Sequence, residues 1–405
     1  MQAISENGSD VHAGMSTAET DVERSVIDRY ARAAEEVEPG LCCPNVSYDA
    51  SLVANLPREI VEKDYGCGDP SPHVQEGETV VDLGSGSGKI CYMLAHKVGP
   101  EGQVIGVDFN DTMLTLARKY QDEMARRIGH AHVRFVKARI QDMALDIERA
   151  EQWLRDHPVT SMTAMSQFDA ECARLRRDEP AVGDGCADVV VSNCVLNLVR
   201  PEDKQRLFGD IFRVLKRGGR AVISDVVCDE DPTPRIFNDA ELWSGCIAGA
   251  FREDRFLEHF EEAGFYGVEI LARQEQPWQV IDGIEFRSIT VRAFKGKDGP
   301  CLERNQAVIY KGPWNKVRDD DGHTLHRGKR MAVCDKTFGI LTNPEGPYGR
   351  DIIAVQPTEE IPLESAGTFD CKSSGVREPR VTKGQDNAET RLREDSPCCE
   401  GEGCC

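Results

Sequence analysis

Residues 80 to 89 read VVDLGSGSGK, and this stretch decides the fold. Two apolar residues lead into Asp82, glycines follow at positions 84, 86 and 88, and the apolar segment ICYMLAHKVG comes next. Glycine lets a backbone turn tightly and approach a ligand closely, because it carries no Cβ. The pattern therefore predicts a strand, a glycine turn and a helix that together bind a nucleotide-like cofactor.

The identity of that cofactor follows from two acidic residues. Asp108 ends the next strand-like run, QVIGVD, where a carboxylate can grip a ribose diol. Asp82 opens the turn, and a carboxylate there opposes a pyrophosphate but suits a cationic ligand. S-adenosylmethionine carries an ammonium, a sulfonium and a ribose. The sequence thus favours S-adenosylmethionine over a dinucleotide, and a turn that binds nothing is the remaining alternative.

Apolar strand-like runs alternate with helical segments over this part of the chain. The runs are TVVDLG, QVIGVD, VRFVKA, ADVVVSN and RAVISDVV. This alternation is typical of an α/β fold with a mostly parallel sheet covered on both faces. A charged segment at about 146–182 is too long for an ordinary connection, so we expect a helical insertion there.

The length of 405 residues predicts two compact units with tails. The polar ends of the chain are expected to be disordered. The expected segments are a disordered start (1–20), an N-terminal helical segment (21–75), an S-adenosylmethionine-binding domain (76–230), a metalloid-binding segment that completes the sheet (231–300), a small mostly β domain (301–360) and a disordered cysteine-rich tail (361–405).

Composition excludes several classes of protein. A net charge of -21 opposes nucleic-acid binding, which needs a basic face. No apolar run approaches the ~18 residues of a membrane span, and the first 20 residues lack a secretion-signal pattern. Sixteen cysteines without such a signal indicate a reducing compartment. We expect a cytoplasmic protein with no nucleic-acid or membrane partner.

Three cysteines stand in unusual local contexts: Cys67 in YGCGDP, Cys194 in VVVSNCVLNLV and Cys246 in WSGCIAGA. Cys194 follows the fourth predicted strand, and ligands of open α/β sheets bind at the carboxyl ends of strands. Cys67 precedes the first strand and Cys246 follows the fifth, so both can reach the ligand site at the carboxyl ends of the strands. Each thiol taken singly also fits a buried small hydrophobe.

Three convergent thiols without a histidine cluster favour a soft, thiophilic centre. Zinc would need a fourth ligand and CxxC-like pairs, which the core lacks. Trivalent arsenic or antimony takes three thiolates in a pyramid and keeps a lone pair that can attack a methyl group. Such a reaction needs no general base, in keeping with the absence of a recognisable Ser/His/Asp or Cys/His set.

On these residues the chain resembles the arsenite S-adenosylmethionine methyltransferases over about residues 41 to 360. The matching stretches are LCCP, YGCGDP, VVDLGSGSGK, VIGVD, VVVSNCVLNLV and ELWSGC. LCCP and QAVIYKGP are most similar to the branch linked with arsenosugar biosynthesis. The resemblance implies a class I (Rossmann-like) fold, S-adenosylmethionine as methyl donor, and arsenite or its thiol complex as the small-molecule substrate of a detoxifying enzyme.

The resemblance also implies roles for single residues. Cys194 and Cys246 match the arsenic-holding cysteines, and Cys67 matches a third that also exchanges disulfides. Cys42 or Cys43 corresponds to a further cysteine of a disulfide relay, which a thiol reductant such as glutathione or thioredoxin resets. The expected donor-binding residues are Asp82, Gly84, Ser85 and Gly86 at the turn, Asp108 at the ribose, Met113, Ile140 and Gln141 at the adenine, and Asn193 in the donor pocket.

We expect a monomer. Two other functions remain open from the residues alone. One is a methyltransferase that acts on carbon or oxygen of a small organic substrate, and it requires no cysteine. The other is a non-catalytic metalloid sensor or sink, which the intact donor turn argues against.

Overall fold

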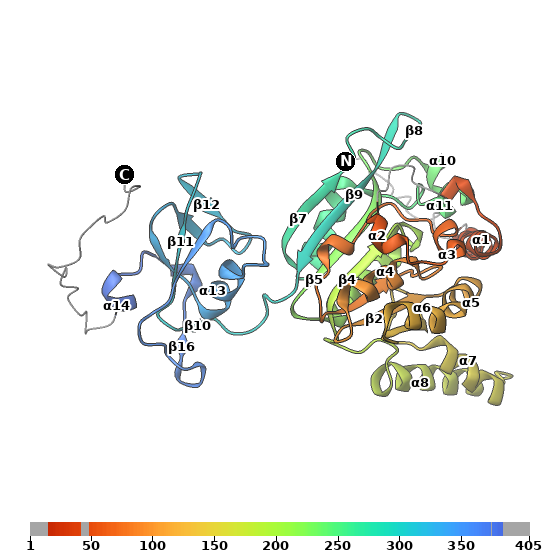
Figure 1. Cartoon of the computed structure of the whole chain (residues 1–405), viewed down its shortest axis with the longest axis horizontal. Helices are drawn as coiled ribbons and strands as arrows, with labels where there is room; N and C mark the ends of the chain where they lie inside the picture. Colours follow the sequence, from red (N-terminus) through yellow and green to blue (C-terminus); the bar gives the residue numbers. More distant parts are fainter. Residues whose placement is uncertain (1–14, 42–47, 374, 384–405) are drawn as a thin grey trace, which may run out of the picture. The chain divides into compact units, whose positions relative to one another are not determined.

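The structure is a computed structural model that describes residues 15–41, 48–373 and 375–383 (Figure 1). The chain divides into two compact units, the first ending at Gly296 and the second beginning at Lys297. Cys42 and Cys43, the first 14 residues and the tail beyond residue 383 lie outside the described residues. Within the described part, no helix is both long enough and apolar enough to cross a membrane.

The first unit is built on one sheet in the order β3-β2-β1-β4-β5-β9-β7, with β6 beside β5 and β8 beside β9 (Figure 1). Strands β1 to β5 run parallel, and β9 is antiparallel to β5 and β7. The five predicted strands are confirmed, and with them the mostly parallel α/β fold. The bounds are β1 (Thr79–Leu83), β2 (Gln103–Asp108), β3 (Val133–Lys137), β4 (Ala187–Asn193), β5 (Leu215–Cys228), β6 (Phe251–Arg252), β7 (Tyr266–Arg273), β8 (Gln279–Ile281) and β9 (Ile284–Phe294).

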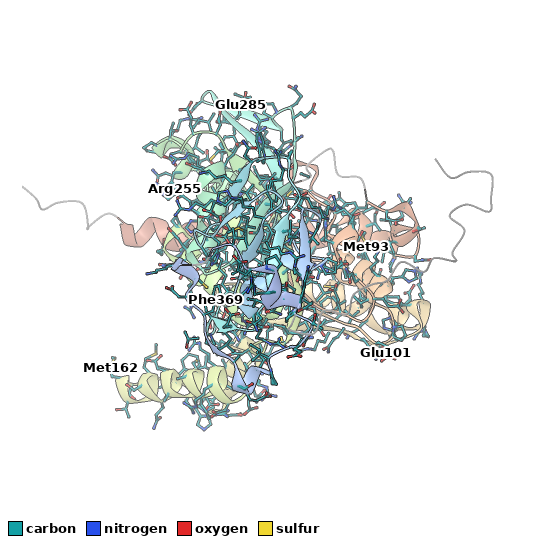
Figure 2. All side chains as sticks on the ribbon, turned by 90° about the vertical axis from the view of Figure 1, so that its left-hand side faces the viewer. Met93, Glu101, Met162, Arg255, Glu285 and Phe369 are labelled. Carbon is teal, nitrogen blue, oxygen red and sulfur yellow. The ribbon has the colours of Figure 1, made fainter. Side chains whose placement is uncertain are left out.

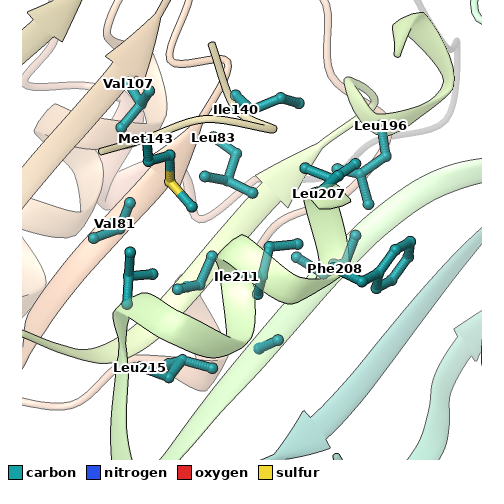
Figure 3. Packing of buried hydrophobic residues seen from close by; sticks show 14 of the residues in the cluster. Val81, Leu83, Val107, Ile140, Met143, Leu196, Leu207, Phe208, Ile211 and Leu215 are labelled. Carbon is teal, nitrogen blue, oxygen red and sulfur yellow. The ribbon is translucent and has the colours of Figure 1, made fainter. Parts of the chain in front are cut away.

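Helices cover both faces of this sheet because successive strand residues point to opposite sides. Val80 packs in a cluster with α4, whereas Val81 packs in another cluster with α9. Figure 3 shows Leu207, Phe208 and Ile211 of α9 against the second face. Burial of each such side chain contributes roughly 1.5–3 kcal/mol. The covering helices are α4 (Lys89–Val98), α5 (Asp111–Lys119), α6 (Gln121–Ile128), α9 (Pro201–Val214) and α12 (Glu253–Glu262).

Two helices, α7 (Ile147–Asp156) and α8 (Met162–Asp178), occupy the segment where the sequence predicts a helical insertion. They share a small cluster that contains Ala150 and Leu175. An ion pair between Arg176 and Asp142, 2.8 Å long, ties α8 to the chain after β3. Met162 lies at the outer end of α8 (Figure 2), where its side chain is 82% exposed.

The N-terminal helix α1 spans Met15–Glu35. The expectation of disorder up to residue 20 is therefore wrong from Met15 onward. Helix α1 packs against α5 and α11, and helix formation is cooperative, so these contacts stabilise a helix that starts before the predicted boundary. The remaining helices of this unit are α2 (Ala50–Val53), α3 (Arg58–Glu62), α10 (Pro234–Phe237) and α11 (Ala240–Ser244).

The second unit contains small antiparallel sheets around α13 (Asp335–Thr342). Its core includes Val308, Tyr310, Met331 and Phe338. The sheets are β14-β11-β15, β12-β13 and β10-β16, formed by β10 (Leu302–Glu303), β11 (Ala307–Tyr310), β12 (Lys316–Arg318), β13 (Thr324–His326), β14 (Arg330–Ala332), β15 (Ile352–Val355) and β16 (Gly367–Thr368).

The expected disorder from residue 361 is wrong up to residue 383. Strand β16 pairs with β10, and helix α14 (Pro379–Lys383) follows it. Arg377 forms an ion pair with Glu303 at 2.9 Å, and Arg330 donates a hydrogen bond to the buried Thr382 at 2.9 Å. Long-range polar contacts order this segment although its own composition is polar and poor in aromatic residues.

Candidate active site

A cavity of about 250 Å³ lies at the carboxyl ends of the parallel strands. This is the edge of an open α/β sheet where ligands bind. The cavity brings together Cys194 and all nine residues predicted to bind the donor, namely Asp82, Gly84, Ser85, Gly86, Asp108, Met113, Ile140, Gln141 and Asn193.

The glycine turn needs its glycines for steric reasons. Gly84 has φ +65°, and a Cβ there would lie 2.5 Å from Cγ1 of Val195. Asp108 holds the turn, since its Oδ2 accepts a hydrogen bond from Gly86 N at 2.8 Å. Its Oδ1 accepts one from Asn110 N, also at 2.8 Å. Each carboxylate oxygen has a second lone pair, so Asp108 can shape the turn and still accept hydrogen bonds from a ligand.

Two buried polar groups in the cavity lack the partners that a ligand would supply. Burial raises the pKa of Asp82 to about 8, although the Cys91 thiol donates a hydrogen bond to it at 3.2 Å. Within the described part of the chain, the buried Ser85 hydroxyl has no hydrogen-bond partner. A cationic group would lower the pKa of Asp82 and compensate its burial. The ammonium and ribose of S-adenosylmethionine fit this set of groups.

Cys194 and Cys246 share an unusual backbone conformation. Both have φ +63°, in the left-handed region. The other described non-glycine residues with positive φ are Asp282 and Asn305, types that tolerate this region. For a cysteine it costs on the order of 1–3 kcal/mol. Such strain clusters at functional sites, and here it falls on two cysteines beside the cavity.

Hydrogen bonds link the loops that carry these two cysteines. The Cys246 thiol donates to the Cys194 carbonyl at 3.2 Å. Asn197 Nδ2 donates to the carbonyls of Cys246 at 3.0 Å and Val226 at 2.6 Å. The Tyr30 hydroxyl lies 3.9 Å from the Cys246 sulfur. The two cysteines thus occupy one connected piece of structure beside the cavity.

Asn193 clamps the loop that carries Cys67. Its Oδ1 accepts hydrogen bonds from Cys67 N at 2.6 Å and Gly68 N at 2.8 Å, and its Nδ2 donates to Gly68 O at 2.7 Å. A Cβ on Gly66 would lie 2.2 Å from Asn193 Nδ2, and one on Gly68 would lie 2.3 Å from Ser224 Oγ. Asn193 therefore lines the cavity and also anchors Cys67, a second role that the sequence did not reveal.

The three predicted arsenic ligands approach one another only in part. Cys67 and Cys194 share one buried cluster, but of the three only Cys194 lines the cavity. Within the described residues, their sulfurs do not all lie within 4.8 Å of one another. Binding of one atom by all three thiols would therefore require the loops to close. Cys42 and Cys43 lie outside the described residues.

Helix α1 forms a wall of the cavity that the sequence did not predict. Glu23, Ile27 and Tyr30 line the cavity from α1. Glu23 forms ion pairs with Arg139 and, at 3.2 Å, with Arg200, which lie in two different loops of the site. The amphipathic pattern of α1 is visible in the sequence, but a pattern does not specify which surface its apolar face covers.

Family models of known proteins match segments of both units. Residues 74–264 match the family model of a methyltransferase domain. Residues 297–387 match the model of a domain of unknown function (DUF8838).

Relatives are found along most of the chain. An arsenite methyltransferase of Aquipseudomonas alcaligenes is 30% identical over 325 residues, which cover 76% of this chain and 83% of the relative. The Homo sapiens arsenite methyltransferase is 26% identical over 365 residues, covering 87% and 86%. The crystal structure of the arsenic(III) S-adenosylmethionine methyltransferase of Chlamydomonas reinhardtii has 26% identity and a TM-score of 0.52, covering 83% of this chain and all of that one. The chain belongs to the arsenite methyltransferase family.

Proposed function

We propose that this chain transfers methyl groups from S-adenosylmethionine to trivalent arsenic held by the thiolates of Cys194 and Cys246. The observation that carries this proposal is the pair of left-handed cysteines beside a cavity lined by all nine residues predicted to bind the donor. The left-handed backbone of these two cysteines lowers stability, and two thiols held in this way next to a methyl donor suit a thiophilic substrate.

On the donor side, bound S-adenosylmethionine supplies an electrophilic methyl group on a positively charged sulfur. Asp82 would hold its ammonium group, and Asp108 would accept hydrogen bonds from its ribose. Met113, Ile140 and Gln141 would hold the adenine. Asp82 ionises when the cation enters, because an opposite charge at close range lowers a carboxyl pKa.

On the acceptor side, the chain's task is to hold arsenic in position. Cys194 and Cys246 bind it, and Cys67 closes onto it as the third ligand. Orientation is the main catalytic contribution, because the lone pair of trivalent arsenic is itself the nucleophile. No histidine from the described residues lines the cavity, in keeping with a reaction that needs no general base.

Methylation formally oxidises arsenic, so thiols must reduce it again. Cys67 and one of the pair Cys42 and Cys43 form the disulfide relay, which an external thiol such as glutathione or thioredoxin resets. All ten described cysteines are free thiols, which supports a reducing compartment such as the cytoplasm. The chain acts as a monomer.

Serine substitutions test the arsenic site. We expect Cys194→Ser and Cys246→Ser each to lower methylation by about 100-fold or more, because a hydroxyl is a poor ligand for a soft centre. The affinity for S-adenosylmethionine should stay within about twofold of the starting value, since neither thiol supplies a contact that the donor requires. Arsenic speciation after reaction and isothermal titration with S-adenosylmethionine measure the two effects.

Cys186→Ser is the matched control, because Cys186 is a half-buried free thiol of the same unit that does not line the cavity. It should keep full methylation. Unchanged turnover in Cys194→Ser or Cys246→Ser would contradict the proposed site. Methyl transfer that occurs without arsenic and ignores both substitutions would favour an organic substrate instead.

A further inference from the structure

The second unit contains a cluster of three cysteines that the function above does not use. Cys301, Cys334 and Cys371 place their sulfurs within 4.8 Å of one another. They are 33 and 37 positions apart along the chain, so no CxxC-like spacing announces them. Cys334 is buried and the other two are half-buried. The fold alone brings them together.

Three separate segments build this cluster. Strands β10 and β16 pair directly beside it, and Phe369 N donates to the Cys301 carbonyl at 2.8 Å. Lys336, in the first turn of α13, donates to Gly299 O at 3.0 Å. These contacts fix Cys301 between the start of α13, where Cys334 lies, and the segment after β16, where Cys371 lies.

Cys334 lies at the N-terminus of helix α13, where backbone and side-chain donors face its sulfur. It caps the N-terminus of α13, and its sulfur accepts a hydrogen bond from Thr337 N at 3.4 Å. The Thr337 hydroxyl lies 3.1 Å from the same sulfur. The positive end of a helix favours a negatively charged ligand atom, so this position suits a sulfur that binds a soft atom.

We propose that Cys301, Cys334 and Cys371 form a second binding site for trivalent arsenic, in the second unit and separate from the methylation cavity. The proposal rests on the proposed function in one respect, since that function brings trivalent arsenic to the chain. Arsenous acid exchanges three As–O bonds for three As–S bonds. The thiol protons leave with the three hydroxides as water, and arsenic stays trivalent, so no oxidant or reductant is consumed.

The number of ligands favours arsenic over zinc. Structural zinc is bound by four ligands, with sulfurs about 2.3 Å from the metal. Within the described residues, no histidine, carboxylate or further thiol joins the three sulfurs as a fourth ligand. Neighbouring charges are paired, since Asp335 binds Arg304 at 2.8 Å and Glu303 binds Arg377 at 2.9 Å. A neutral arsenic tris-thiolate matches these surroundings better than an anionic zinc complex.

A full-length background variant isolates this site, with serine in place of Cys42, Cys43, Cys67, Cys194, Cys246, Cys398, Cys399, Cys404 and Cys405. The reduced variant is incubated with arsenite and desalted, and its arsenic content is measured by mass spectrometry. We expect about one arsenic atom per chain, because the three remaining clustered thiols can bind it. X-ray absorption should then show three sulfur neighbours, a result that needs no further substitution.

Adding Cys334→Ser to the background should abolish arsenic retention, whereas adding Cys186→Ser should preserve it. Cys371→Ser, at a half-buried position, repeats the test if Cys334→Ser changes the thermal unfolding of the chain. Absence of arsenic from the background variant, or retention despite both ligand substitutions, would overturn the proposal. So would a parallel incubation with zinc alone in which zinc is retained and then excludes arsenite. Methylation by the unsubstituted chain is measured separately, so failure of that activity leaves this result readable.

Discussion

Cys194 and Cys246 show how single residues carry the proposed chemistry at a cost to stability. Each has a left-handed backbone, although cysteine gains nothing from that conformation. The hydrogen bond from the Cys246 thiol to the Cys194 carbonyl then ties the two positions together. The fold specifies both the place and the direction of two thiols, and this is what an arsenic site requires.

The strain at Cys194 can be measured with a pair of variants. Alanine at position 194 keeps the strained backbone, whereas glycine relieves it. Relief of the backbone strain favours glycine, whereas the larger entropy of glycine in the unfolded chain favours alanine. We expect the first effect to be larger, so that Cys194→Gly is more stable than Cys194→Ala by about 1 kcal/mol. Urea denaturation of the two variants gives the difference in free energy of unfolding. An alanine variant at least as stable as the glycine variant would show that position 194 is unstrained.

Asp82 is a second residue whose role in binding lowers the stability of the fold. Its pKa is raised by burial to about 8 in the folded chain, against about 3.9 for an unperturbed aspartate. At a pH between these two pKa values, Asp82 is therefore protonated in the folded state and ionised in the unfolded state. Stability from the neutral carboxyl is complete below about pH 4 and is lost as the pH rises towards about 8.

Asp82→Asn removes this titration. Relative to the wild type, we expect the variant to become more stable as the pH rises from 5 to 8, by up to about 1.4 kcal/mol per pH unit. The same variant should bind S-adenosylmethionine at least about tenfold more weakly, because the ammonium loses its charged partner. Thermal unfolding at several pH values and calorimetric titration measure the two effects. A stability difference that is the same at pH 5 and pH 8 would contradict a raised pKa at Asp82.

At the scale of elements, the site is assembled by segments that are distant along the chain. The loop with Cys67 rests on Asn193 at the end of β4, and α1 covers the cavity from one side. The close approach depends on Gly66 and Gly68, because a Cβ at either position would overlap Asn193 or Ser224. These contacts place Cys67 without any covalent constraint.

Gly68→Ala tests this arrangement. The added Cβ should displace the Cys67 loop from β4 and β5 and lower methylation by roughly 10- to 100-fold, since a displacement of about 1 Å can have that effect. Affinity for S-adenosylmethionine should change much less. Gly183→Ala is the control, because no atom lies within 4 Å of its ideal Cβ position. Equal methylation rates in the two variants would show that the glycine at position 68 is not needed.

The sequence predicted the sheet well because its signal is local. Apolar runs such as ADVVVSN predict strands from their own residues alone, and the spacing of the glycines predicts the turn in the same way. The clamp by Asn193 and the covering of the cavity by α1 join segments more than 80 residues apart. No local pattern specifies such pairings, so the sequence pointed to nine residues that line the cavity but missed Glu23 and Tyr30.

At the scale of the whole molecule, the order of the second unit also depends on long-range contacts that local sequence patterns do not specify. Residues 361–383 read as a disordered tail because they are polar, yet β16 and the Arg377–Glu303 ion pair order them against β10. That ordering also brings Cys371 to Cys301 and Cys334. Each of the two units thus has its own group of cysteines. The group in the first unit lies beside the cavity, whereas no described residue of the second unit lines that cavity.

The most direct test of the central claim is arsenic speciation with the intact, reduced chain. The protein is incubated with arsenite, glutathione and S-adenosylmethionine, and the arsenic species are separated by chromatography with mass detection. We expect methylated arsenic that is absent without protein, with one S-adenosylhomocysteine formed for each methyl group transferred. Recovery of inorganic arsenic alone, from a chain that still binds S-adenosylmethionine, would contradict the claim.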